Sequence, residues 1–152
     1  MVTLNNKMTL KRSLAKDICL AGMALLSFLL GVLIYIGFRS NNLMMFEWAD
    51  AVGLDSTIRY IREGICHIAL GSFVRYSLPD GFWLLSYLLI IDVIWRDEST
   101  YKLIFILLLP LIAICVEFFQ LAGFVRGFFD IFDLASYIGA ILVYKLTKTY
   151  LL

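Results

Sequence analysis

Long apolar runs separated by short polar segments are the first feature of this chain. The run from Ile18 to Phe38 carries no charge and is long enough to cross a hydrocarbon core about 30 Å thick. Three later runs follow the same pattern: Gly81 to Ile91, Leu103 to Val125 with Glu117 as its only charge, and about Asp130 to Leu152. The pattern predicts an all-α integral membrane bundle of about four transmembrane helices.

The connection between the first two spans, residues 39–78, is long and charged. From Ile58 to Tyr76, apolar residues recur every three or four positions, as they do on one face of a helix. The stretch between Glu63 and Arg75 is too short to cross a bilayer. We therefore expect an amphipathic helix that lies at the membrane interface or re-enters the membrane, with a fifth, poor span as the alternative.

Signals for a helix start and for an ion pair mark the two ends of the second span. Pro79 and Asp80 suit a first helical turn, where proline's missing donor is not needed and an acid complements the helix dipole. Asp92 and Arg96 lie four positions apart and can pair on one helix face. The second span is therefore predicted to begin beside Pro79 and to end beside this pair.

Composition places the chain among polytopic membrane proteins rather than globular enzymes. Its 152 residues are 62% hydrophobic and 16% charged, against roughly 45–50% and 25% in soluble domains, and its mean hydropathy is +0.89. The length predicts one domain, residues 1–152. A net charge of +1 gives no reason to expect a nucleic-acid partner. Three cysteines and one histidine offer neither a disulfide framework nor a zinc site, and we expect no cofactor.

Lysine and arginine are distributed unequally across the predicted spans. The basic segment 1–17, the loop 96–102 and the C-terminal end hold more of them than the opposite side does. The positive-inside rule then predicts a multi-pass protein of the cell membrane with both termini in the cytoplasm. The outer ends of spans two, three and four should accordingly meet at the outer leaflet.

Polar side chains gather at these outer ends, in a part of the chain that is otherwise apolar. Glu117 lies about 9 Å along the helix from Gly123, so it is too deep for a rim position and needs a partner or a proton. A pair between Glu117 and Arg126, which would join spans three and four, is one interpretation. Asp130 and Asp133 can equally serve as caps of the last helix.

This polar cluster resembles a known family signature. An acid and an amide three positions apart, followed by an arginine, an aspartate and a glycine-bearing apolar helix, are similar to the motif of the VanZ-like membrane protein family. The residues at the motif positions are Glu117, Gln120, Arg126 and Asp133. The likeness covers mainly the motif region, residues 78–145.

The resemblance implies a single VanZ-like transmembrane domain. Proteins of this family are small and polytopic, and the founding members are associated with low-level resistance to the glycopeptide antibiotic teicoplanin. The family often has Asn one turn after the last aspartate of the motif, where this chain has Tyr137.

Our first hypothesis is a non-enzymatic membrane protein with an outward-facing polar pocket that binds a lipid headgroup or a cell-wall precursor. Carboxylates would accept hydrogen bonds or hold a cation, and the arginine would hold a phosphate or carboxylate. The candidate ligand-binding residues are Asp80, Glu117, Gln120, Arg126, Asp130, Asp133 and Tyr137.

Two alternatives belong to other functional classes. In an intramembrane lipid-modifying enzyme, the carboxylates would act as acid and base or hold a metal, although no nucleophile has an evident base beside it. A small transporter built on a narrow four-helix bundle without visible inverted repeats would need to form a homo-oligomer. The same bundle could also be a scaffold subunit of a larger complex.

Overall fold

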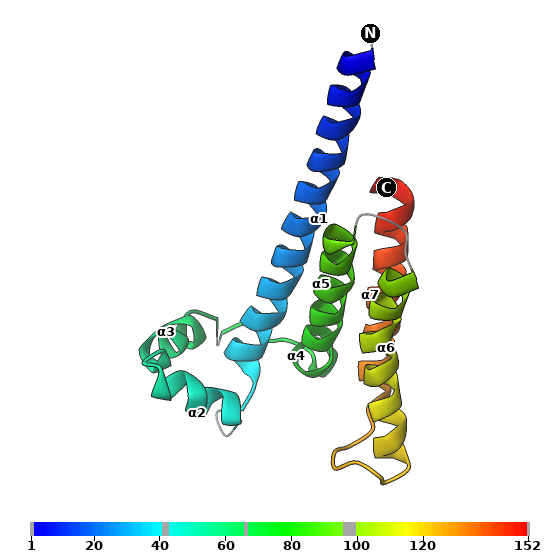
Figure 1. Ribbon diagram of the computed structural model, residues 1–152. Coiled ribbons are helices and arrows are strands. Elements are labelled where there is room, and N and C mark those ends of the chain that lie inside the picture. Colours follow the sequence, from blue (N-terminus) through cyan, green and yellow to red (C-terminus); the bar gives the residue numbers. More distant parts are fainter. Residues whose placement is uncertain (1, 41–42, 66, 96–99, 152) are drawn as a thin grey trace.

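The computed structural model of the protein describes residues 2–40, 43–65, 67–95 and 100–151 (Figure 1). Within these ranges the chain forms helices and no strand, which confirms the all-α prediction. The helices are α1 (Val2–Phe38), α2 (Met44–Ala51), α3 (Asp55–Ile65), α4 (Ser72–Tyr76), α5 (Leu78–Ile94), α6 (Thr100–Leu121) and α7 (Ile131–Leu151).

Among the residues that the structure describes, two helices are long and apolar enough to cross a membrane. They are the part of α1 from Leu14 to Phe38 and the whole of α6. Many of their large apolar side chains point outward instead of into a protein core, and Leu26 and Leu111 are each more than half exposed. A buried core helix of a soluble protein would hide such residues. Two helices of this kind indicate a membrane location without fixing how many times the chain crosses.

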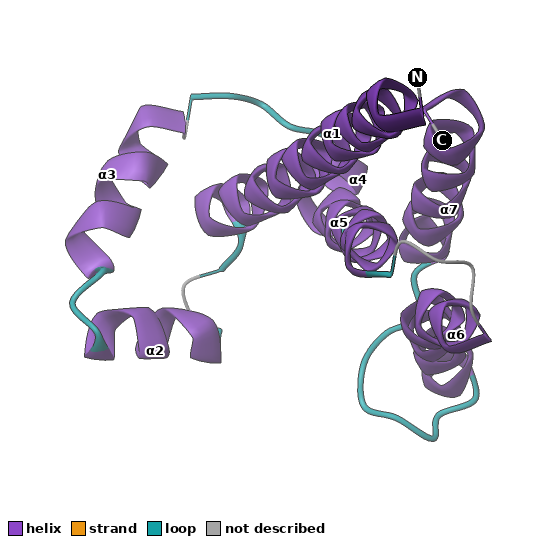
Figure 2. Cartoon of the chain, turned by 45° about the horizontal axis from the view of Figure 1, so that its top comes forward, coloured by secondary structure: helices purple, strands orange, loops and turns teal. Residues whose placement is uncertain are grey.

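Helix α5 is the centre of the bundle, with α1 packed on one side and α7 on the other (Figure 2). Helix α6 lies against α5 and α7 and makes fewer contacts. The buried core lies between α1, α5 and α7. It is formed by Leu20, Ala24, Leu84, Leu88, Leu89, Ala140 and Tyr144.

Small residues allow α5 to approach its two neighbours closely. A Cβ atom at Gly31 of α1 would lie 2.7 Å from Nε1 of Trp83, and one at Gly81 of α5 would lie 2.9 Å from the carbonyl oxygen of Ser136 in α7. The hydroxyl of Ser27 also donates a hydrogen bond of 2.8 Å to the carbonyl of Phe82. This use of small and hydroxyl side chains is typical of helices that pack within a membrane.

The connection between α1 and α5 differs from the single amphipathic helix predicted over 58–76. Helix α3 ends at Ile65 and α4 begins only at Ser72. The prediction of one continuous helix is therefore wrong. Glycines at both sides of the break, Gly64 and Gly71, lower the helix propensity there. The additional helix α2 was not predicted, and with α3 it projects to one side of the end of α1 (Figure 1).

Asp92 has a partner in the structure that the sequence analysis did not name. Its carboxylate pairs with Lys102 at the start of α6, with Nζ and Oδ1 2.5 Å apart, and both side chains are at most 5% exposed. Helix α5 ends at Ile94, two residues before Arg96, the partner that the sequence predicts for Asp92. Arg96 itself lies outside the described residues.

Candidate functional site

Three helix ends meet at the end of the bundle opposite the two chain termini (Figure 1). The first turn of α5 brings Asp80, the last turns of α6 bring Glu117, and the first turns of α7 bring Asp133 and Tyr137. Helix α5 starts here because Pro79 occupies its first turn, as the sequence predicts. The alternating directions of α5, α6 and α7 therefore bring residues from three separate segments to one place.

A pocket of about 160 Å³ lies between α5, α6 and α7 at this end. Two of the predicted site residues, Asp80 and Tyr137, line it, while the other lining residues are mostly apolar and include Trp83 and Leu109. The volume is that of a small ligand group rather than of a whole lipid. The pocket therefore offers a carboxylate and a phenol hydroxyl in an apolar setting.

Carboxylates dominate the electrostatics around this pocket. Asp80 interacts with the charges of Asp133 and Glu117, and Tyr137 interacts with the same three acids. Arg39, at the end of α1, also lies within electrostatic range of Asp80. Acids that lie near one another and away from bulk water repel unless a cation, a proton or a hydrogen-bond donor joins them.

Glu117 is buried, at 5% exposed, and is tied to the start of α7. Its Oε2 accepts a hydrogen bond of 3.3 Å from the backbone N–H of Asp130. The side chain of Asp130 in turn accepts a bond of 2.8 Å from the N–H of Phe132, which confirms the predicted capping role of this aspartate. In contrast, Oδ1 of Asp133 is buried without a hydrogen-bond partner. Asp133 is therefore the acid with unmet hydrogen-bonding capacity beside the pocket.

We expect the cap made by Asp130 to be measurable. Asp130→Ala should lower the free energy of unfolding by about 1 kcal/mol, because the first turn of α7 loses its side-chain acceptor. Asp130→Asn keeps an acceptor oxygen and should retain most of that stability. Denaturant titration of the detergent-solubilised protein, followed by circular dichroism, measures both, and equal losses in the two variants would show that the cap contributes nothing.

Arg126 and Gln120 take positions that differ from those considered for them. Arg126 is exposed in the loop between α6 and α7. The structure describes both Arg126 and Glu117, and the two make no ion pair. Helix α6 ends at Leu121, before the Val125 expected from the apolar run, so the loop carries Arg126 away. Gln120 packs against Gly127, where an added Cβ would lie 2.6 Å from its Nε2.

The arginines that the sequence analysis left out, Arg39 and Arg75, lie among aromatic rings at this end. Arg39 donates a 2.8 Å hydrogen bond to the carbonyl of Tyr76, and its guanidinium lies 5.3 Å from the ring centre of Tyr35. Arg75 lies 5.8 Å from the ring centre of Phe38. The Nε atoms of both arginines are buried without a hydrogen-bond partner. The signal in the sequence that could have indicated these arginines is the presence of aromatic residues next to an arginine at the end of the first apolar run.

The chain offers little for a metal at this site. No group of three or more His, Cys, Asp or Glu side chains among the described residues could hold a metal ion. Cys19 and Cys115 are exposed free thiols, and Cys66 lies outside the described residues.

Comparison with known proteins adds no relative: no family model, no curated protein and no solved structure matches this chain.

Proposed function

We propose that the chain is a VanZ-like, multi-pass protein of the cell membrane whose outward-facing pocket binds a lipid headgroup or another cell-envelope component. Four crossings by α1, α5, α6 and α7 would carry the chain across and back twice. The N- and C-terminal ends lie at one end of the bundle (Figure 1), whereas Asp80 and Tyr137, which line the pocket, come from the first turns of α5 and α7 at the opposite end, and this arrangement supports the count. With the termini in the cytoplasm, the pocket faces outward.

One observation supports the proposal more than any other. Asp80 and Tyr137 line a pocket between three helices, and Glu117 and Asp133 lie within electrostatic range of both. Intramembrane acids are costly, and their usual justification is a bound ligand, an ion path or a partner charge. A headgroup that carries an amine or several hydroxyls would supply the missing donors.

Residues outside the pocket would add further contacts to the bound component. Arg126, exposed in the loop, is placed where it could meet a phosphate or carboxylate at the membrane surface. Gln120 packs against Gly127 of the same loop and would hold that loop in position. In this proposal the protein binds and presents an envelope component and does not transform it.

Removal of the charge at Asp80 tests the proposal directly. After incubation with a total lipid extract of the host envelope, the detergent-solubilised wild-type protein should retain a bound lipid species in native mass spectrometry. Asp80→Asn should retain it at least about tenfold less, because one charge-assisted hydrogen bond is lost. The same variant in cells, at an equal protein level, should alter sensitivity to teicoplanin if the resistance role implied by the VanZ likeness applies.

A matched control is available on α3, where Glu63 is exposed and lies outside the pocket. Glu63→Gln removes one carboxylate and should leave lipid retention unchanged. Equal retention by wild type and Asp80→Asn, with both proteins folded by circular dichroism, would contradict the proposal.

A further inference from the structure

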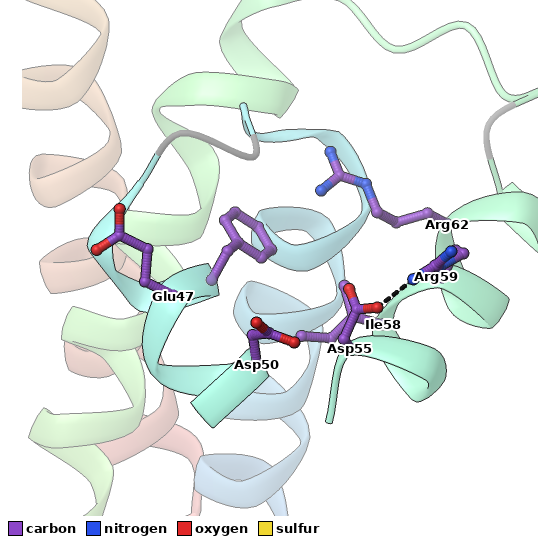
Figure 3. Close-up of a pocket in the computed structure, with 7 residues that line it drawn as sticks. Glu47, Asp50, Asp55, Ile58, Arg59 and Arg62 are labelled. Atoms are coloured by element: carbon purple, nitrogen blue, oxygen red, sulfur yellow. Dashed lines mark hydrogen bonds and ion pairs between the residues drawn. The ribbon is translucent and has the colours of Figure 1, made fainter. Parts of the chain in front are cut away.

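A second hollow, of about 520 Å³, lies between α2 and α3, apart from the pocket described above (Figure 3). Its lining residues come only from these two helices. They are Phe46, Glu47, Asp50, Asp55, Ile58, Arg59 and Arg62. None of them was assigned a role by the sequence analysis, and none takes part in the proposed function.

The basic side of the hollow belongs to α3. Arg62 lies with its guanidinium 5.2 Å from the ring centre of Phe46 and donates a hydrogen bond to the carbonyl of Arg39. Arg59 pairs with Asp55 one turn earlier, and this hydrogen bond raises the pKa of the guanidinium above its ordinary value. Both arginines are therefore held in place by neighbours, Arg59 by Asp55 and Arg62 by Phe46 and the carbonyl of Arg39.

The acidic side belongs mainly to α2. Glu47 and Asp50 come from this helix, and Figure 3 shows Glu47 on one side of the hollow and the two arginines on the other. No three acids among the described residues are placed to hold a metal ion, so a divalent cation is not the natural occupant. A plain anion would meet the α2 acids, and a plain amine would meet the arginines.

The face of α2 opposite the hollow indicates the depth at which the hollow lies in the membrane. Met44 and Trp48, one helical turn apart, are 63% and 65% exposed, and Val52 beyond the helix is 71% exposed. Exposed tryptophan and aliphatic side chains on one face of a short helix are typical of segments that lie in the membrane interface. The hollow would then be at the depth of the lipid headgroups.

We propose that the hollow between α2 and α3 binds a zwitterionic phosphate–amine headgroup, with its phosphate at Arg59 and Arg62 and its ammonium at Glu47 and Asp50. A ligand with both charges satisfies both walls at once, which neither a plain anion nor a plain amine does. Phe46 adds an aromatic face beside the charged groups. This site does not depend on the pocket between α5, α6 and α7.

The experiment compares two phospholipids that share a phosphate but differ in the amine. Full-length protein in detergent is incubated with equal amounts of phosphatidylethanolamine and phosphatidylglycerol, and bound lipid is quantified by native mass spectrometry. The wild type should retain phosphatidylethanolamine about fivefold more, as expected for one exposed ion pair. Equal retention of the two lipids by the wild-type protein would overturn the proposal.

Substitutions in each wall of the hollow test which wall binds the ammonium and which binds the phosphate. Glu47→Gln with Asp50→Asn should abolish the preference while leaving phosphatidylglycerol bound, whereas Arg62→Gln should reduce the retention of both lipids. Glu63→Gln, which removes an exposed acid of α3 that lines neither pocket, should leave the preference intact. Loss of the preference in the Glu47 and Asp50 double variant, in which Asp80 is unchanged, would then be a property of this hollow alone. An unchanged preference in the folded Glu47 and Asp50 double variant would contradict the assignment.

Soluble phosphoethanolamine identifies the source of the headgroup. Competition by it shows that the free compound is sufficient, and its failure to compete while the lipid preference persists shows that acyl chains are also needed. Either result supports a phosphate–amine site.

Discussion

Replacement of Lys102 by methionine should destabilise the protein by about 3–5 kcal/mol, because it leaves the Asp92 carboxylate buried without its ion-pair partner. The two side chains join the end of α5 to the start of α6, and each is at most 5% exposed. Withdrawal of one charge from such a pair costs far more than the loss of a surface ion pair, which is worth about 0–1 kcal/mol. Denaturant titration of the detergent-solubilised protein measures the difference.

Two controls separate the buried pair from a general effect of losing a lysine. Lys145→Met changes an exposed lysine of α7 in the same way and should shift stability by less than about 0.5 kcal/mol. The double variant Asp92→Leu with Lys102→Met removes both charges and should recover most of the loss. If Lys102→Met were as stable as Lys145→Met, the pair would not stabilise the fold.

Sequence reasoning succeeded where the signal was long and local. The apolar run that begins at Ile18 and the one that begins at Leu103 both became helices, because twenty or so apolar residues leave the backbone few alternatives in a membrane. The start of α5 at Pro79 was also predictable, since proline suits a first helical turn, where its missing N–H is not needed.

Prediction from the sequence failed where the structure of a short segment depends on contacts with the rest of the chain. Helix α3 is held against α1, because Ile65 packs where Gly37 leaves room and Arg62 bonds to the carbonyl of Arg39. These contacts join residues far apart along the chain, so periodicity within 58–76 could not show that the helix breaks after Ile65.

The candidate site was predictable in its acids but not in its cations. The structure brings together Asp80, Glu117 and Asp133 because α5, α6 and α7 alternate in direction, which the count of apolar runs already implied. Closeness in sequence favoured Arg126 as their partner. The fold instead brings Arg39, from the end of α1, within electrostatic range of Asp80, an arrangement that only the packing of α1 on α5 reveals.

Substitution of Gly81 by alanine should both destabilise the protein and open the pocket. A Cβ atom there would lie 2.9 Å from the carbonyl oxygen of Ser136, and backbone atoms cannot turn aside as the end of a side chain can. The helices α5 and α7 must therefore separate, at a cost of about 1–3 kcal/mol, as for other overpacked interiors. Since Asp80 and Tyr137 line the pocket from these same two helices, their separation should also weaken lipid retention.

Gly22 supplies the matched control, because it lies in α1 and an added Cβ would meet no atom within 4 Å. Gly22→Ala should leave lipid retention unchanged and stabilise the helix by up to about 1 kcal/mol, since alanine has the higher helix propensity. Denaturant titration and native mass spectrometry on the two variants give both readouts. Opposite signs of the stability change would establish that contact between α5 and α7 at Gly81, and not glycine content, determines the effect; a stabilising Gly81→Ala would show that the two helices are not in close contact there.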